Sequence, residues 1–243
     1  MLRLLFCSVF FINSMAMTAA ESFASDIFKT TAGDLKITFV GHGSLLFNFK
    51  NLNLYIDPFG QLADFSLMPK ADLIVITHQH QDHFDSAAIE ILRQKNTQIL
   101  ITAACQPAPM GSRVLKNFDH ASEQGIDIDV VPAYNIVNQR SSGVPFHPRG
   151  EGNGYVFTFA NLRVYVAGDT ENIPEMSGLK NIDIAFLPMN LPYTMTPEMT
   201  AQAAKSFNPR ILYPYHFGSS DTQRLDELLK DVPHITLRVR KMN

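Results

Sequence analysis

Cysteine is scarce in this chain, and no stretch of it carries charge of only one sign. Of its two cysteines, Cys7 lies in an apolar N-terminal segment, so removal of that segment would leave Cys105 alone and unable to form an intrachain disulfide. The 20 basic and 23 acidic residues are dispersed and give a net charge of −3. This balance favours neither nucleic acid nor an anionic membrane as an electrostatic partner.

Long hydrophobic runs are also missing. The apolar run LLFCSVFFI near the N-terminus is too short to span a bilayer. Arg3 is the only charge before Glu21, and the small residues Thr18 and Ala20 occupy positions −3 and −1 before Glu21. This pattern predicts a signal peptide over 1–20, a secreted or periplasmic protein, and no stable membrane span after cleavage. A membrane-anchored tail or a buried first helix is the alternative.

The rest of the chain, 21–243, alternates strand-like and helix-like segments without a linker. Each half has strands, then a helix, then a strand, which predicts a single domain built from two similar halves. The fold class expected is α/β, an αββα sandwich of two mixed sheets with outer helices. The expected helices are 86–95, 196–207 and 222–230, and the expected strands lie within 35–49, 51–59, 71–77, 98–104, 126–134, 154–170, 182–190, 210–218 and 234–240.

Polar side chains collect where these expected strands end, which is where open α/β sheets bind ligands. The stretch THQHQDH directly follows the apolar segment ADLIVIT and holds His78, His80, Asp82 and His83 within six residues. Packing gives no reason for such a cluster, and it would be electrostatically poor without a metal ion. Imidazole nitrogen and carboxylate oxygen are zinc ligands. The lone histidines His120 and His234, by contrast, are expected to be structural.

THQHQDH resembles the Thr-His-x-His-x-Asp-His signature of the metallo-β-lactamase superfamily. AGDT (167–170) resembles the aspartate motif of that family, and YPYHFG (213–218) resembles its last histidine motif. VGHGSLLF and LYIDPF also resemble the opening strands of the subgroup that contains L-ascorbate-6-phosphate lactonase and the N-acylphosphatidylethanolamine-hydrolysing phospholipase D. The resemblance covers about residues 36–218.

The resemblance implies two metal ions bound by residues from distant parts of the chain. His78 and His80 would bind the first ion, Asp82, His83 and His216 would bind the second, and Asp169 would bridge them. The family usually places one more histidine on the first ion, after a Pro-Ala-aromatic segment. Here that segment is VPAYN, so Asn135 stands at the expected position.

Two interpretations of this departure remain open. Either His147, twelve residues further on, reaches back as the missing ligand, or the first ion is weakly held or absent. Asparagine oxygen suits harder ions such as manganese better than zinc. Two divalent ions are therefore expected, with zinc favoured and manganese or iron as alternatives.

Several other residues are candidates for supporting or substrate-binding roles. His42, between two glycines, could orient a metal ligand or bond a turn, and Asp57 could hydrogen-bond a metal-binding histidine or cap a turn. Tyr193, with Thr194 and Met195, could line the mouth of a pocket or serve helix capping and core packing. Arg149 could receive an anionic substrate group or be merely solvated.

The function expected is that of a metal-dependent hydrolase. A metal-bound hydroxide would cleave an ester, lactone, amide or phosphodiester bond of a small-molecule or lipid-like substrate, with Asp82 or a metal-bound water handling the proton. The pattern sits closer to the lactonase and phospholipase subgroup than to true β-lactamases. An iron-dependent oxidoreductase with the same ligands and a non-catalytic metal-binding protein are the alternatives. The sequence predicts neither the substrate nor the oligomeric state.

Overall fold

The structure, a computed structural model, describes residues 23–242. The predicted signal peptide over 1–20 lies outside the described residues. Within 23–242, no helix is both long enough and apolar enough to cross a membrane.

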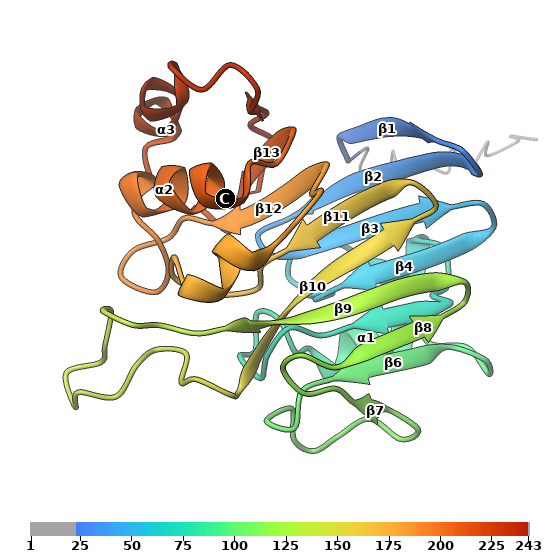
Figure 1. Cartoon of the computed structure of the whole chain (residues 1–243). Coiled ribbons are helices and arrows are strands. Elements are labelled where there is room, and N and C mark those ends of the chain that lie inside the picture. Colours follow the sequence, from blue (N-terminus) through green and yellow to red (C-terminus); the bar gives the residue numbers. More distant parts are fainter. Residues whose placement is uncertain (1–22, 243) are drawn as a thin grey trace, which may run out of the picture.

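Two mixed β-sheets form the centre of the molecule, and both have the same topology (Figure 1). In each sheet the first four strands pair antiparallel and the remaining pairs are parallel. The first sheet has the spatial order β1 (Ser25–Thr30), β2 (Gly33–Gly41), β3 (Ser44–Phe49), β4 (Leu52–Ile56), β5 (Leu73–Val75), β6 (Gln98–Ile101) and β7 (Arg113–Val114). The second sheet follows the same rule with β8 (His120–Glu123), β9 (Ile126–Ala133), β10 (Gly152–Phe159), β11 (Leu162–Val166), β12 (Ile184–Pro188), β13 (Ile211–Tyr215) and β14 (Thr236–Leu237).

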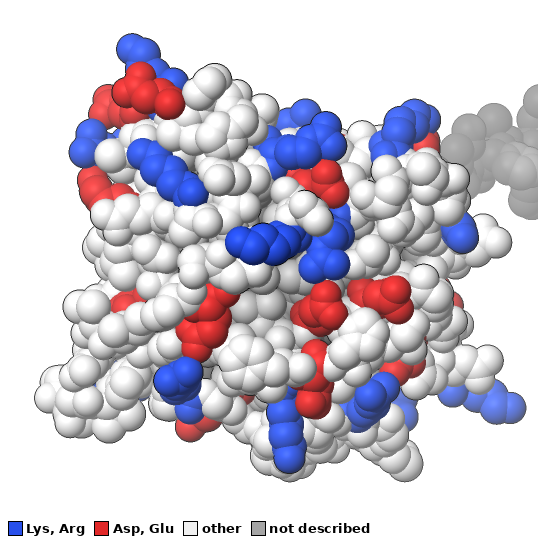
Figure 2. Space-filling model, viewed as in Figure 1, with Lys and Arg blue, Asp and Glu red and all other residues white. Residues whose placement is uncertain are grey.

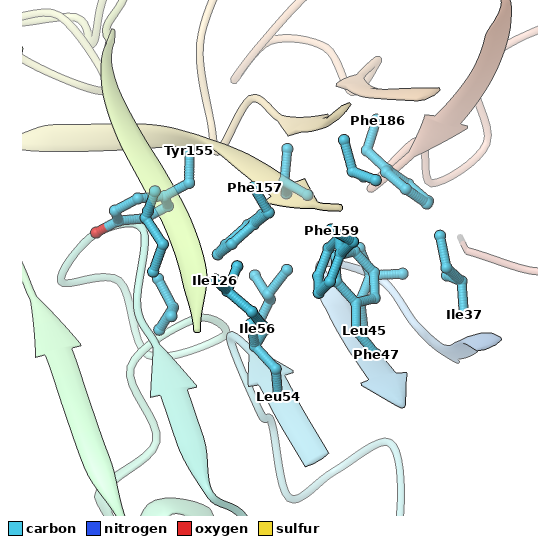
Figure 3. Packing of buried hydrophobic residues seen from close by; sticks show 14 of the residues in the cluster. Ile37, Leu45, Phe47, Leu54, Ile56, Ile126, Tyr155, Phe157, Phe159 and Phe186 are labelled. Atoms are coloured by element: carbon cyan, nitrogen blue, oxygen red, sulfur yellow. The ribbon is translucent and has the colours of Figure 1, made fainter. Parts of the chain in front are cut away.

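The core between the two sheets is rich in aromatic residues. Phe47 of the first sheet packs edge-on against Phe157 and Phe159 of the second, with ring centroids 5.9 and 5.7 Å apart. Figure 3 shows these rings among aliphatic side chains from both sheets. Truncating a fully buried ring such as Phe47 to alanine costs about 3–5 kcal/mol in comparable cores. The two sheets are therefore joined mainly by apolar packing.

Helices cover the outer face of each sheet, as expected for an αββα sandwich. α1 (Ser86–Leu92) and the 3₁₀ turn η1 (Phe65–Leu67) pack on the first sheet through a second apolar cluster. α2 (Pro197–Phe207), α3 (Thr222–Leu229) and η2 (Pro174–Gly178) belong to a third cluster on the second sheet. Side chains cap the starts of two of these helices: Asp85 accepts from the amides of Ala87 and Ala88, and Thr196 accepts from the amide of Met199.

Three strands were not predicted, and two expected elements are shorter than predicted. The sequences of β1, β7 and β8 show no strong alternation of apolar and polar residues. The helix expected over 86–95 ends at Leu92, because Arg93 is already extended. The strand expected over 234–240 is reduced to β14, since the residues after Leu237 serve a different contact: Arg238 and Arg240 pair with Asp26 of β1.

Charges of both signs are interspersed on the face drawn in Figure 2, with no continuous region of one sign. Charged side chains of the protein form ion pairs, such as Arg113 with Glu123 at 2.7 Å and Arg210 with Asp183 at 3.1 Å. Exposed pairs of this kind contribute at most about 1 kcal/mol each, so the apolar clusters dominate stability.

Candidate metal centre

One edge of the sandwich collects the ends of strands from both sheets. Asp57 follows β4, the His78 cluster follows β5, Asp169 follows β11, His216 follows β13, and Asn135 follows β9. The long loop between β9 and β10 extends from this edge and carries His147 (Figure 1). Segments far apart in the sequence therefore meet here.

The first group of candidate ligands consists of His78, His80 and His147. Nε2 of His78 lies 3.1 Å from Nδ1 of His80, which lies 3.2 Å from Nε2 of His147. Oδ2 of Asp169 is 3.3 Å from the same nitrogen of His147. Ligands of one tetrahedral zinc ion with bonds of 2.0–2.1 Å are separated by about 3.3–3.4 Å. The spacing of this group is thus that of a single ion's ligands.

The second group consists of Asp82, His83 and His216. Oδ2 of Asp82 lies 3.4 Å from Nε2 of His216 and 3.7 Å from Nε2 of His83. Asp169 belongs to this group too: its Oδ1 is 3.6 Å from Nε2 of His83, and its Oδ2 is 3.5 Å from Nε2 of His216. Asp169 is thus the residue that the two groups share.

Asp57 and Thr77 fix which ring nitrogen of His83 and His78 faces the metal centre. The buried carboxylate of Asp57 accepts from Nδ1 of His83 at 2.8 Å and from the hydroxyl of Thr77 at 2.6 Å. The Thr77 oxygen then has its lone pairs free to accept from Nδ1 of His78 at 3.0 Å. With their Nδ1 atoms protonated, His78 and His83 present the lone pair of Nε2 to the centre.

Asn135 performs the same task for His147. Its Oδ1 accepts from both the backbone amide and Nδ1 of His147, at 2.8 and 2.7 Å. Its amide nitrogen donates to Glu171 and to the carbonyl of Tyr193. Of the two residues considered for the missing position, His147 faces the His78–His80 pair and Asn135 lies behind it.

Glu171 is a residue of the site that sequence reasoning missed. Its carboxylate is fully buried and accepts from the backbone amides of Ile136, Val137 and Asn138 at 2.7–2.8 Å, as well as from Asn135. These bonds tie the start of the β9–β10 loop to the segment that carries Asp169. A glutamate directly after the Gly-Asp-Thr motif was the only signal available in the sequence.

A second residue that the sequence reasoning missed is Asn190, which follows β12. Its side-chain amide lies 3.4 Å from Nδ1 of His216, on the side of the ring away from the centre. Gly218 leaves the room for this amide, since a Cβ there would lie 3.1 Å from it. The atom of Asn190 that faces Nδ1 of His216 is the amide nitrogen, whereas Asn135 presents an oxygen to His147, so the two contacts are not equivalent.

The backbone at three strand ends adopts the left-handed conformation, which non-glycine residues seldom do. His42, Asp57 and His216 have φ values of 49°, 45° and 46°. Such conformations cluster at functional sites because the turn directs the side chain out of the strand's pleat. Gly43 is required for space, since a Cβ there would lie 2.8 Å from the His83 ring.

His42 and Tyr193 lie at the centre, whereas Arg149 does not. Nε2 of His42 is 2.9 Å from Oδ2 of Asp82, and its ring lies on His216 with centroids 3.7 Å apart. Tyr193 lines the cavity above the cluster, while the neighbouring Thr194 and Met195 are buried. Arg149 is absent from that lining; it pairs with Glu175 at 2.8 Å and covers the ring of Tyr134.

The two remaining histidines also lie apart from the cluster, as the sequence predicted. His120 pairs with Asp129 at 2.8 Å, and His234 bonds Asn208 at 2.8 Å, both on the surface. Neither belongs to any group of candidate ligands among the described residues.

The residues fit a pair of cations. Nε2 of His83, Oδ1 of Asp169 and Nε2 of His216 are buried and have no hydrogen-bond partner among the described residues. Although burial lowers the pKa of His83, the carboxylates of Asp169 and Asp57 raise it to about 9. The buried carboxylates thus favour a positive charge at this point, which a metal ion supplies in place of the proton.

In the first group, burial prevails over the nearby carboxylates. It lowers the pKa of His80 to about 4, assisted by the neighbouring His147. His80 is therefore neutral near pH 7, which is the form that binds a metal ion. The donor set, imidazole nitrogen with carboxylate oxygen, is the one zinc prefers.

Comparisons with known proteins agree with this geometry. The sequence pattern described as "Beta-lactamase superfamily domain" matches residues 36–216. The chain belongs to the metallo-β-lactamase superfamily. The predicted superfamily and sandwich fold are thereby confirmed, and with the relatives below, the protein is a metal-dependent hydrolase.

Similar proteins include both sequence relatives and solved structures. A UPF0173 metal-dependent hydrolase of Thermococcus kodakarensis is 29% identical over 221 residues, covering 84% of this chain and 96% of its own. A crystal structure of a protein from Parabacteroides distasonis, named as a metal-dependent hydrolase, has a TM-score of 0.87 and 46% identity, covering 91% of this chain and 100% of its own. Igni18, a metallo hydrolase from Ignicoccus hospitalis, has a TM-score of 0.69 at 24% identity over 86% of this chain and 96% of its own, which shows the shared fold. The finer resemblance to the lactonase and phospholipase subgroup stays a prediction.

Proposed function

We propose that this metallo-β-lactamase superfamily member uses two divalent cations, with zinc preferred, to hydrolyse an ester, lactone, amide or phosphodiester bond in a small-molecule or lipid-like substrate. His78, His80 and His147 would hold one cation, Asp82, His83 and His216 would hold the other, and Asp169 would contact both. The observation that carries the proposal is the presence of two ligand groups that share Asp169, each at the spacing of one ion's ligands.

The chemistry divides between the cations and the chain. When bound, the cations polarise the bond to be cleaved and lower the pKa of water. The chain fixes the ligands through buried hydrogen bonds, including those that Asp57 and Asn135 accept from His83 and His147. No imidazole of the cluster then has to reorient during the reaction.

Asp82 is the residue that we assign to proton handling. It lines the cavity, and its side chain is 38% exposed, whereas Asp169 is buried. Partial burial raises its pKa, but the neighbouring imidazoles of His216 and His42 outweigh burial and hold the pKa well below its usual range. Asp82 is therefore ionised at neutral pH and can accept a hydrogen bond from the attacking water while His42 holds it in place.

The proposal is tested by metal analysis joined to a substrate panel. Purified protein is assayed for bound zinc, manganese and iron, and for hydrolysis of p-nitrophenyl acetate, γ-butyrolactone and bis(p-nitrophenyl) phosphate. We expect close to two equivalents of metal, loss of activity after chelation, and recovery on adding zinc. Activity that survives complete metal removal, or the absence of bound metal and of hydrolysis of every probe, would overturn the proposal.

We also propose that the protein is exported, on the strength of the N-terminal pattern over 1–20. Its test is mass spectrometry of the protein recovered from cell fractions. Export predicts a mature chain beginning at Glu21 outside the cytoplasm. Recovery of the uncleaved chain in the cytoplasm would contradict it.

A further inference from the structure

The cavity above the metal centre has one cationic side chain in its wall. The cavity has a volume of about 430 Å³, and its lining includes Arg140 and Phe146 from the β9–β10 loop and Tyr193 from the segment after β12. Arg140 is the only lysine or arginine in that lining. Arg140 is therefore the cation at the cavity, where the sequence had suggested Arg149 as the residue that receives an anionic group.

The guanidinium of Arg140 is held by aromatic packing, and its donors are free. Among the described residues it forms no ion pair and no side-chain hydrogen bond. It lies over the ring of Phe146 at 5.1 Å, and that ring packs edge-on against Tyr193 with centroids 5.1 Å apart. Arg149, on the same loop, differs in that Glu175 already occupies its guanidinium.

The backbone beneath Arg140 is anchored at both ends of a tight turn. Its amide donates to the carbonyl of Val144, and its carbonyl accepts from Gly143. Residues 139 and 145 pair as an isolated bridge, and the amides of 136–138 are bound by Glu171. The turn therefore fixes the backbone from which the Arg140 side chain reaches the cavity wall.

Exposed apolar side chains lie on the two loops that contribute residues to the cavity wall. Ile136, Val137 and Val144 of the β9–β10 loop are 48%, 72% and 48% exposed, and Leu191 and Tyr193 are 49% and 45% exposed. Exposed apolar residues are unremarkable singly, but a group next to a ligand cavity marks a binding surface. The wall thus combines one free cation with an apolar border.

We propose that Arg140 is a specificity-determining residue that binds an oxyanion of the substrate, a carboxylate or a phosphate, while Phe146, Tyr193 and the apolar border hold an adjoining apolar group. The planar guanidinium donates two parallel hydrogen bonds to either oxyanion. This inference rests on the proposed function, since it names the substrate class of the same site. The substrate is accordingly an amphipathic anion.

The test measures binding of three probes that share one chain: octanoate, octyl phosphate and the neutral octanamide. Titration calorimetry is performed on zinc-loaded wild type, Arg140→Ala, Arg140→Lys and the matched control Arg149→Ala. A hydrogen bond to a charged group contributes about 1.5–3 kcal/mol, which corresponds to roughly 10–100-fold in affinity. We expect Arg140→Ala to weaken an anionic probe by that factor, to leave octanamide unchanged, and Arg149→Ala to match wild type.

The probes also separate the two oxyanions, because the tighter of octanoate and octyl phosphate identifies the group that the site prefers. Arg140→Lys should retain part of the affinity, since it keeps the charge but loses the paired donors. The inference is overturned if octanamide binds as well as both anions, if no anion binds wild type, or if Arg140→Ala equals Arg149→Ala. These outcomes differ from failure of the proposed function, which metal content and the hydrolysis panel report separately.

Discussion

The two groups of candidate ligands are held in different ways. In the second group, Asp82 and His83 follow β5 closely and His216 follows β13 directly, and the fully buried Asp57 braces His83. In the first group, the third ligand, His147, comes from the middle of the β9–β10 loop and depends on Asn135 and, through it, on Glu171. Strand ends support one group, whereas a loop tied down by hydrogen bonds completes the other.

This difference suggests that the two cations are held with unequal strength. A loop orders its ligand only while its anchoring hydrogen bonds persist, and loops open more readily than sheet edges. The first cation should therefore leave before the second when a chelator is added.

Substituting Asp169 should weaken metal binding by both groups and so abolish the difference in affinity between them. Asp169→Asn removes the charge that the groups share, so we expect the metal content to fall below one equivalent. Loss of several kcal/mol of transition-state stabilisation corresponds to about 1000-fold or more in kcat/KM. Metal analysis and steady-state kinetics measure the two effects. Retention of both ions by this variant would show that Asp169 does not bridge them.

Removing His147 should affect only one group. His147→Ala deletes the ligand supplied by the loop, so the chain should keep about one equivalent of metal, bound by the second group. Activity should fall on the order of 100-fold or more, as expected when one of two ions is lost. Metal titration of the variant provides the check. Unchanged metal content and rate would exclude His147 as a ligand.

Asp57→Asn tests the support of the second group. The substitution removes the charge that holds Nδ1 of His83 and the hydroxyl of Thr77, and changes of this kind cost about 10–100-fold in metal affinity. Competition with a chromogenic chelator should show the weakening in the more tightly held equivalent. Because Thr77 also orients His78, a smaller loss in the first group is expected. If the variant bound metal with the affinity of wild type, Asp57 would not be a residue that supports the second group.

Glu171→Gln should produce the smallest effect and only in the first group. The amide of glutamine would place a donor against amides of the 136–138 segment, so the loop should loosen and His147 should lose part of its alignment. We expect the cation of the first group to bind about tenfold more weakly. This is the lower end of the range for residues that orient a metal ligand. Hydrogen exchange of 136–147 should rise in parallel. If both cations bound more weakly by the same factor, the inference that only the first group depends on the β9–β10 loop would be wrong.

Much of the fold was predictable because its cues are local. The repeated order of strands and helices is present, and the caps at Asp85 and Thr196 and the β10–β11 hairpin involve only neighbouring residues. β1 was not predicted, because its position depends on remote partners. Asp26 binds the hydroxyl of Tyr213 and the guanidinium of Arg240, residues nearly the whole chain away. No property of the local sequence announces such contacts.

The sequence by itself determined which residue types stand at the strand ends and, through its motifs, the superfamily. Most of the ligands stand in short segments directly after apolar stretches, and this pattern is visible in the local sequence. Only the tertiary structure decided that His147 faces the His78–His80 pair with Asn135 behind it, that Glu171 anchors their loop, and that Arg140 rather than Arg149 reaches the cavity. The path of a long loop depends on hydrogen bonds to distant segments, and these exist only once the sheets have packed together.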